Sequence, residues 1–180
     1  MAETRNLAIL LFDDVEVLDF CGPFEVFSVA NREADPAAFN VFTVAEKPDA
    51  ITARNGLSVN PQHTLTDCPK PDLLLVPGGI GTRNEIDNEL MIDWIKRTAD
   101  NAKLVLSVCT GALLLGKAGL LDGLEATTHR VAFDLLREIV PTASHRSSIG
   151  HDGQVTEQDV PDNLAMLFSN KRDFDEATVT

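Results

Sequence analysis

The chain has 180 residues, 44% hydrophobic and 24% charged, a composition typical of one globular domain with a sizeable core. Its 28 acidic and 15 basic side chains give a net charge of −13, which argues against nucleic acid or an anionic membrane as a partner. The three cysteines are odd in number and far apart, so they form neither a disulfide framework nor a metal-ligand pattern. We therefore expect a cytoplasmic protein without a metal ion or cofactor.

No targeting or membrane-spanning segment is expected. The N-terminus lacks the basic region of a signal peptide, and the apolar run that follows it ends at Phe12. No apolar run approaches the roughly 18 residues of a membrane span. No repeat or low-complexity tract divides the chain, so residues 1–180 are expected to form a single domain.

The predicted elements alternate between strands and helices. Asn55-Gly56 predicts the turn of a small hairpin within residues 51–60, and short apolar runs predict buried strands at residues 6–12, 39–45, 73–76 and 104–108. Helices are predicted from Gly22-Pro23 to about residue 31 and at residues 88–101, 112–117, 131–140 and within 160–169. This alternation predicts an α/β fold whose central, mostly parallel sheet is covered by helices on both faces.

The most informative stretch is LVLSVCTGALLLG, residues 104–116. A short apolar run leads into Cys109, and small residues then allow a sharp turn into a helix. This pattern predicts a nucleophile elbow, in which Cys109 is held in strained backbone geometry at the carboxyl edge of the sheet. The helix N-terminus would favour the thiolate. The alternative is a buried core cysteine, because free cysteines are among the most buried residues.

Asp19 follows the first predicted strand and is the single carboxylate in the segment VLDFCGP. Parallel strands place the loops that follow them at one edge, so Asp19, the Pro77-Gly78-Gly79 loop and Cys109 are expected to form one site. A carboxyl group among apolar neighbours has a raised pKa and suits proton transfer beside a thiol. The alternative is that Asp19 caps the following helix, a position that aspartate fills well.

Backbone and hydroxyl groups near Cys109 are candidates for substrate binding. The amides of Gly78 and Gly79 are candidates for an oxyanion hole, although most Gly-Gly pairs after strands form simple turns. Thr110 follows the cysteine, where its N–H would complete that hole and its hydroxyl would contact substrate. His129 is a candidate base for a Cys–His dyad; alternatively it caps a helix or lies in a loop near the site.

Together, the segments LLFDDVEVLDFCGPFEVF, LLLVPGGIGTR and LSVCTGALLLGKAGLLDGLEATTHR resemble the ThiJ/PfpI family of the class I glutamine amidotransferase-like superfamily. Within it, they are similar to the isonitrile hydratases and to the sensor domains of AraC-type regulators. The resemblance covers residues 6–143 and implies a flavodoxin-like three-layer sandwich, commonly a homodimer. It also implies that Cys109 is the nucleophile and Asp19 the acid, with Thr110 and Gly79 at the substrate and His129 near the pocket.

The resemblance implies a hydratase that converts a small isonitrile into an N-substituted formamide through a Cys109 thioimidate, with Asp19 as acid and base. The alternatives are a glyoxalase- or deglycase-like activity on small aldehydes and a non-enzymatic domain that senses a ligand or oxidation. Residues after about 144 depart from the family pattern, so the last strand and helix are expected to be shortened or rebuilt.

Overall fold

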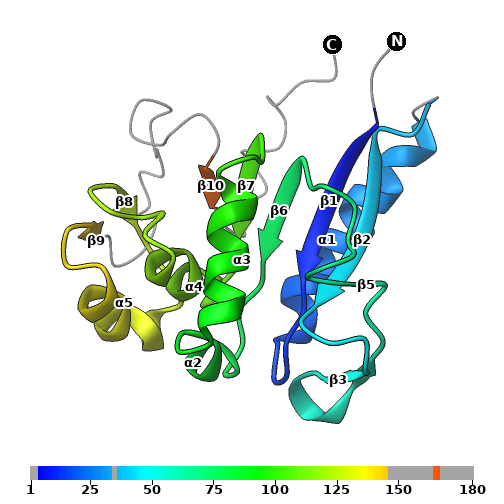
Figure 1. The fold of residues 1–180 in the computed structure, drawn as a ribbon. Coiled ribbons are helices and arrows are strands. Elements are labelled where there is room, and N and C mark those ends of the chain that lie inside the picture. The colour runs from blue at the N-terminus through cyan, green and yellow to red at the C-terminus, as the bar shows by residue number, and fades with distance from the viewer. Residues whose placement is uncertain (1–3, 34–35, 146–163, 167–180) are drawn as a thin grey trace.

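The computed structural model describes residues 4–33, 36–145 and 164–166, and its central feature is a six-stranded sheet (Figure 1). The strand order is β10-β7-β6-β1-β2-β5, and each pairing in this sheet is parallel. The strands are Arg5–Leu10 (β1), Phe39–Ala45 (β2), His63–Thr64 (β5), Leu73–Val76 (β6), Leu104–Ser107 (β7) and Leu164–Met166 (β10). All four predicted strands are confirmed, with ends that differ from the prediction by no more than about two residues.

Helices cover both faces of the sheet, as the alternation of strands and helices predicts. In Figure 1, α1 (Val17–Ala30) lies behind β1 and β2, and α3 (Glu89–Ala99) lies in front of the sheet near β6 and β7. Helix α4 (Gly111–Lys117) packs against β6 and β7, and α5 (Phe133–Ile139) packs on α4. The architecture is a flavodoxin-like α/β fold. None of the helices in the described part of the chain has the length and apolarity that a membrane crossing requires.

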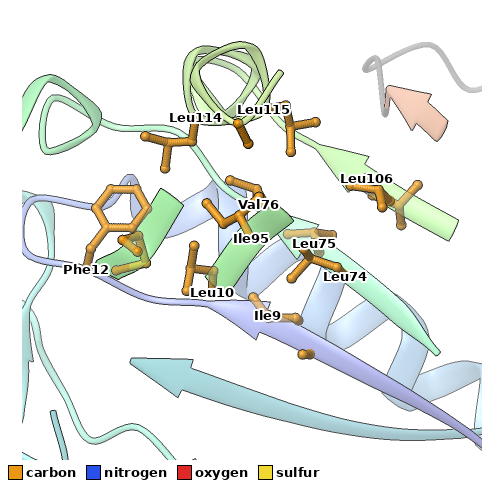
Figure 2. Packing of buried hydrophobic residues seen from close by; sticks show 14 of the residues in the cluster. Ile9, Leu10, Phe12, Leu74, Leu75, Val76, Ile95, Leu106, Leu114 and Leu115 are labelled. Atoms are coloured by element: carbon orange, nitrogen blue, oxygen red, sulfur yellow. The ribbon is translucent and has the colours of Figure 1, made fainter. Parts of the chain in front are cut away.

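The core lies around the central strands. Residues 7–11 and 73–76 are at most 3% exposed, because helices cover the sheet from both sides. Figure 2 shows Leu74 and Leu106 of the sheet packed in one cluster with Ile95 of α3 and with Leu114 and Leu115 of α4. Each fully buried leucine or isoleucine contributes about 1.5–3 kcal/mol relative to an exposed one. This packing therefore holds the carboxyl ends of the central strands in fixed positions.

Helix α1 begins earlier than Gly22-Pro23 predicts. It starts at Val17, and Pro23 lies inside it. The apolar side chains at residues 17, 20, 24 and 27 recur at helical spacing and pack on the core, so their burial extends the helix ahead of the proline. The early start places Asp19 in the first turn of the helix instead of in a loop.

The predicted hairpin within residues 51–60 is confirmed as the antiparallel pair β3 (Ile51–Thr52) and β4 (Ser58–Val59). Asn55 and Gly56 both have positive φ, 62° and 83°, a backbone conformation that these two residue types tolerate. The hairpin also contacts the loop after β1, where the Asp14 N–H donates to the Thr52 carbonyl at 2.8 Å. It therefore supports the segment that leads into α1.

Residues 164–166 form a strand, so the helix predicted within residues 160–169 is wrong at this point. Ala165 of β10 lies opposite Leu106 of β7. A short apolar run does not distinguish a strand from a buried helix, and the edge of β7 has backbone groups that a further strand can pair. The remainder of that predicted helix lies outside the described residues.

Several short elements were not predicted from sequence. They are β5, α2 (Thr82–Glu85) and β9 (Ser144–His145), which forms a parallel pair with β8 (Glu125–Ala126). The predicted helix at residues 131–140 is present as a 3₁₀ turn, Arg130–Ala132, followed by α5. Elements of two to four residues are too short to show the periodicity on which sequence prediction depends.

The neighbouring strands β1, β6 and β7 end at the same edge of the sheet. The loops that follow them therefore meet at this edge, as predicted. β1 pairs with β2 on one side and with β6 on the other, so the strand order reverses there. Open α/β sheets bind ligands at such a switch point, outside the carboxyl ends of the strands. The loops after β1 and β6 are also bonded directly, because the Glu16 N–H donates to the Gly78 carbonyl at 2.9 Å and Val15 pairs with Gly79.

Candidate active site

Cys109 lies at the sharp turn between β7 and α4. Its φ of 54° falls in the left-handed region that residues other than glycine avoid, so the predicted elbow geometry is confirmed. The Thr128 hydroxyl donates to the Cys109 carbonyl at 3.1 Å and helps to hold this conformation. The cysteine side chain is half-buried, so it is not sealed in the core.

Asp19 reaches the elbow from the first turn of α1. Its Oδ2 accepts a hydrogen bond from the Gly78 N–H at 3.1 Å. Its carboxyl group also lies close enough to the Cys109 thiol for each group to shift the pKa of the other. The N-cap of α1 is Glu16, and no side-chain hydrogen bond caps this helix end. The alternative that Asp19 is a helix cap is therefore wrong, and its carboxyl group faces the cysteine.

The two side chains shift each other's ionisation. Burial raises the pKa of Asp19, and hydrogen bonds from the Gly78 N–H and the Cys109 thiol oppose that shift. The pKa of Cys109 is raised as well, first by burial and then by the negative charge of Asp19, while the N–H and hydroxyl of Thr110 lower it. The Thr110 N–H at the start of α4 does lower the pKa of Cys109, but burial and the nearby carboxylate outweigh it, so the net shift disfavours the thiolate.

The raised pKa of Cys109 favours the protonated thiol, and the carboxyl group of Asp19 lies beside it as a partner for proton transfer. Two groups that interact this closely titrate as a unit, and the proton between them belongs to the pair. The arrangement suits a reaction in which sulfur attacks an electrophile while Asp19 takes the thiol proton and then returns it.

The glycine amides have partners within the site. The Gly78 N–H donates to Asp19, and the Gly79 N–H donates to the Thr110 hydroxyl oxygen at 2.9 Å. Both N–H groups were candidates for an oxyanion hole, but in this structure they hold two side chains in place. A Cβ on Gly78 would lie 2.5 Å from the Thr110 nitrogen and 2.9 Å from Asp19 Oδ2, so only glycine fits there.

His129 is exposed and caps the 3₁₀ turn that follows it. Its Nδ1 accepts the Val131 N–H at 3.5 Å, which agrees with the capping alternative. Its charge also lowers the pKa of Asp19, so it lies close enough to influence the site. A Cys–His dyad would instead require the ring to bond the Cys109 thiol.

Sequence reasoning missed two buried threonines of the site. Thr128 bonds the elbow carbonyl, and Thr82 of α2 donates to the Gly79 carbonyl at 2.8 Å. Thr128 lies in the segment ATTH and Thr82 in the segment GGIGTR, both of which carry the family resemblance. Their roles could not be predicted, because the hydrogen-bond partner of a hydroxyl group depends on tertiary contacts. Across the described ranges, no group of three or more histidine, cysteine, aspartate or glutamate side chains is arranged to hold a metal ion.

The chain matches the DJ-1/PfpI family over residues 5–169. It belongs to that family. A THiJ/PfpI family protein from Pseudomonas syringae has a similar structure, with a TM-score of 0.68 and 28% identity, covering 83% of this chain and 66% of that one. The resemblance inferred from the three sequence segments is therefore confirmed.

Two relatives of this DJ-1/PfpI protein have different descriptions. Isonitrile hydratase from Pseudomonas putida is 40% identical over 131 residues, which are 73% of this chain and 55% of that protein. The HTH-type transcriptional regulator CdhR from Pseudomonas aeruginosa is 34% identical over 142 residues, 78% of this chain and 41% of that protein. The chain thus spans about half the length of these relatives, and both an enzyme and a regulator are among them.

Proposed function

We propose that this chain adds water to a small isonitrile, R–N≡C, and releases the N-substituted formamide. The observation that carries the proposal is the pairing of the elbow thiol of Cys109 with the carboxyl group of Asp19. Similarity to the Pseudomonas putida isonitrile hydratase supports the choice of substrate class. A thiol can add to the terminal carbon of an isonitrile only if a proton is delivered to that same carbon. Cys109 provides the nucleophile, and Asp19 provides the proton.

In the proposed first step, the sulfur of Cys109 forms a bond to the terminal carbon. The thiol proton passes to Asp19 as the sulfur attacks, and Asp19 then delivers it to the same carbon. The product is a thioimidate, S–CH=N–R, and the carboxylate is regenerated. The raised pKa of Asp19 suits this role, because a general acid works best when its pKa lies near the working pH.

In the proposed second step, Asp19 removes a proton from a water molecule that attacks the thioimidate carbon. The carbon–sulfur bond breaks, the nitrogen and sulfur each end with one proton, and the formamide HC(=O)–NH–R leaves. One water molecule is consumed per isonitrile, and Cys109 and Asp19 return to their starting protonation states.

A paired assay tests the proposal. Formamide from cyclohexyl isonitrile and lactate from methylglyoxal are measured for the wild-type protein, Cys109→Ala and Asp19→Asn. We expect formamide from the wild type and a loss of about 100-fold or more in both variants. Lactate without formamide would instead support the glyoxalase-like alternative and contradict the proposal.

A sensing domain is the second candidate, and the similarity to the regulator CdhR favours it. In that case Cys109 would react with an oxidant or bind a ligand without turnover. Absence of both formamide and lactate, together with rapid formation of a sulfenic acid on Cys109 under dilute peroxide, would support sensing over catalysis.

A further inference from the structure

Arg83 stands apart from the other basic side chains of the chain. Among the described residues it is the only lysine or arginine that is half-buried, whereas the others are exposed. It lies in the short helix α2, directly after the buried Thr82. The proposed reaction makes no use of Arg83. Because a charge drawn out of water costs free energy unless it is paired, its position in the fold needs an explanation.

The partners of the Arg83 guanidinium group are neutral oxygens. Its Nη1 lies 3.2 Å from the Thr82 hydroxyl and 3.4 Å from the Gly79 carbonyl. No carboxylate in the described part of the chain lies within ion-pairing distance of Arg83, although the chain has 28 acidic residues. Both bonds use Nη1, so Nη2 and Nε keep their N–H groups for an anion. Two such N–H groups match the two oxygens of a carboxylate.

One carbonyl group connects Arg83 to the elbow. The Gly79 oxygen accepts the Thr110 hydroxyl at 3.0 Å as well as Nη1 of Arg83. Thr110 follows Cys109 directly, and α2 packs against α4, the helix that begins after the elbow. The positive charge of Arg83 therefore borders the loop that forms one side of the candidate site.

We infer that Arg83 is a specificity-determining residue that binds a carboxylate on the electrophile attacked by Cys109. The inference deepens the proposed function and rests on it, because the favoured substrate is then an isonitrile whose substituent carries a carboxylate. Isocyanoacetate is the smallest such molecule, with one carbon between the isonitrile nitrogen and the carboxylate. The positive charge of Arg83 also offsets the charge of Asp19, which by itself repels an anion.

The charge preference of the site can be measured with two alkylating reagents of nearly equal size. Iodoacetate carries a carboxylate and iodoacetamide a neutral amide, and each forms an S–CH2 bond to the thiolate and releases iodide. The ratio of their rates at Cys109 at one pH, followed on its peptide by mass spectrometry, does not depend on the thiolate fraction. We expect Arg83→Met to lower the ratio of the iodoacetate rate to the iodoacetamide rate about tenfold, because a charged hydrogen bond is lost.

Three controls separate this role from a structural one. Arg83→Lys keeps the charge but not the planar fork, so it should lower the ratio by no more than about threefold. Arg97→Met removes an exposed positive charge on α3, and exposed Cys21 gives an internal reference in each variant. A structural role for Arg83 would slow both reagents alike. An unchanged ratio in Arg83→Met, or an equal fall in Arg97→Met or at Cys21, would overturn the inference.

Turnover gives a second readout. The wild-type protein should have a kcat/KM about tenfold higher for isocyanoacetate than for its neutral methyl ester, and Arg83→Met should lose this preference mainly through KM. Equal kcat/KM values of the wild type for the two compounds would also overturn the inference. If neither isonitrile is hydrated, the proposed function fails, whereas the alkylation ratio requires no hydratase activity and still decides the role of Arg83.

Discussion

The amide nitrogen of Gly78 lies 3.1 Å from Oδ2 of Asp19, so the loop after β6 holds the carboxyl group that α1 supplies. This bond fixes the carboxyl group beside Cys109, which lies in the loop after β7. The candidate site is therefore assembled by contacts between loops, and its chemistry depends on the spacing between them.

Asp19→Asn should have opposite effects on turnover and on the thiol. Turnover should fall by about 100-fold or more, because the amide cannot transfer the proton. The pKa of Cys109 should fall, because the carboxylate charge that helps to raise it is gone, although burial keeps part of the shift. The pH profile of Cys109 alkylation measures this directly, and an unchanged or higher thiol pKa would contradict the arrangement described for the pair.

Gly78→Ala should abolish activity. The added Cβ would lie 2.5 Å from the Thr110 nitrogen and 2.9 Å from Asp19 Oδ2, so the carboxyl group or the elbow must move. The matched control is Gly22→Ala in α1, where the nearest atom to a Cβ is 3.8 Å away. That control should keep its activity, because an added Cβ is far from the site; no gain in stability is expected, since the ring of Pro23 disfavours a helical residue with a Cβ before it. Equal activity of the two variants in the isonitrile assay would show that Gly78 can be replaced.

The elbow strain can be measured with two inactive variants. Cys109 has a φ of 54°, which costs about 1–2 kcal/mol for a residue with a Cβ and little for glycine. Cys109→Gly should therefore be more stable to urea unfolding than Cys109→Ala by about 1 kcal/mol. At an ordinary loop position the order would be reversed, so a more stable alanine variant would argue against strain at this turn.

A carboxylate cluster away from the site predicts a pH-dependent stability. The Asn88 amide donates to Glu46 at 2.7 Å and to Glu85 at 2.8 Å, and burial followed by the charges of Glu46 and Asp13 raises the pKa of Glu85. A carboxyl group whose pKa is higher in the folded state loses stabilisation as pH rises through that raised value. Glu85→Gln should thus stabilise the protein at pH 7, by about 0.2–1 kcal/mol for partly exposed charges, and give no gain near pH 3.5.

Urea unfolding at the two pH values checks this prediction, with Glu138→Gln as a control for the loss of one exposed negative charge. A similar gain in both variants would point to the net charge of −13, not to the cluster around Glu85. A gain that persists at low pH would also contradict the explanation, because Glu85 is then protonated in the folded and the unfolded protein.

The elements that could be predicted from sequence have local signals. The unbroken run LLLV identifies β6 because both faces of that strand are covered, and the passage from an apolar run through Cys109 to small residues identifies the elbow. The helix start was misplaced because Pro23 is a strong local signal for a first turn, whereas the packing of Val17 and Phe20 on the core is a tertiary effect.

The ionisation of the site and its hydroxyl network could not be predicted in the same way. The direction of the Cys109 pKa depends on burial and on a carboxylate that arrives from another loop. Likewise, Thr82 and Thr110 are 28 residues apart in the sequence, and nothing local to either residue indicates that their hydroxyl oxygens lie 3.3 Å apart. Their partners are set only when the loops after β6 and β7 pack together.

The most direct test of the central claim is to trap the bond between Cys109 and the substrate. The wild-type protein, Cys109→Ala and Asp19→Asn are mixed with cyclohexyl isonitrile, quenched in acid within milliseconds to seconds, and analysed by intact mass and peptide mapping. We predict one added isonitrile mass, located on the Cys109 peptide of the wild type and absent from Cys109→Ala. Formamide production that persists in Cys109→Ala, with no adduct on the wild-type cysteine at any time, would contradict the account.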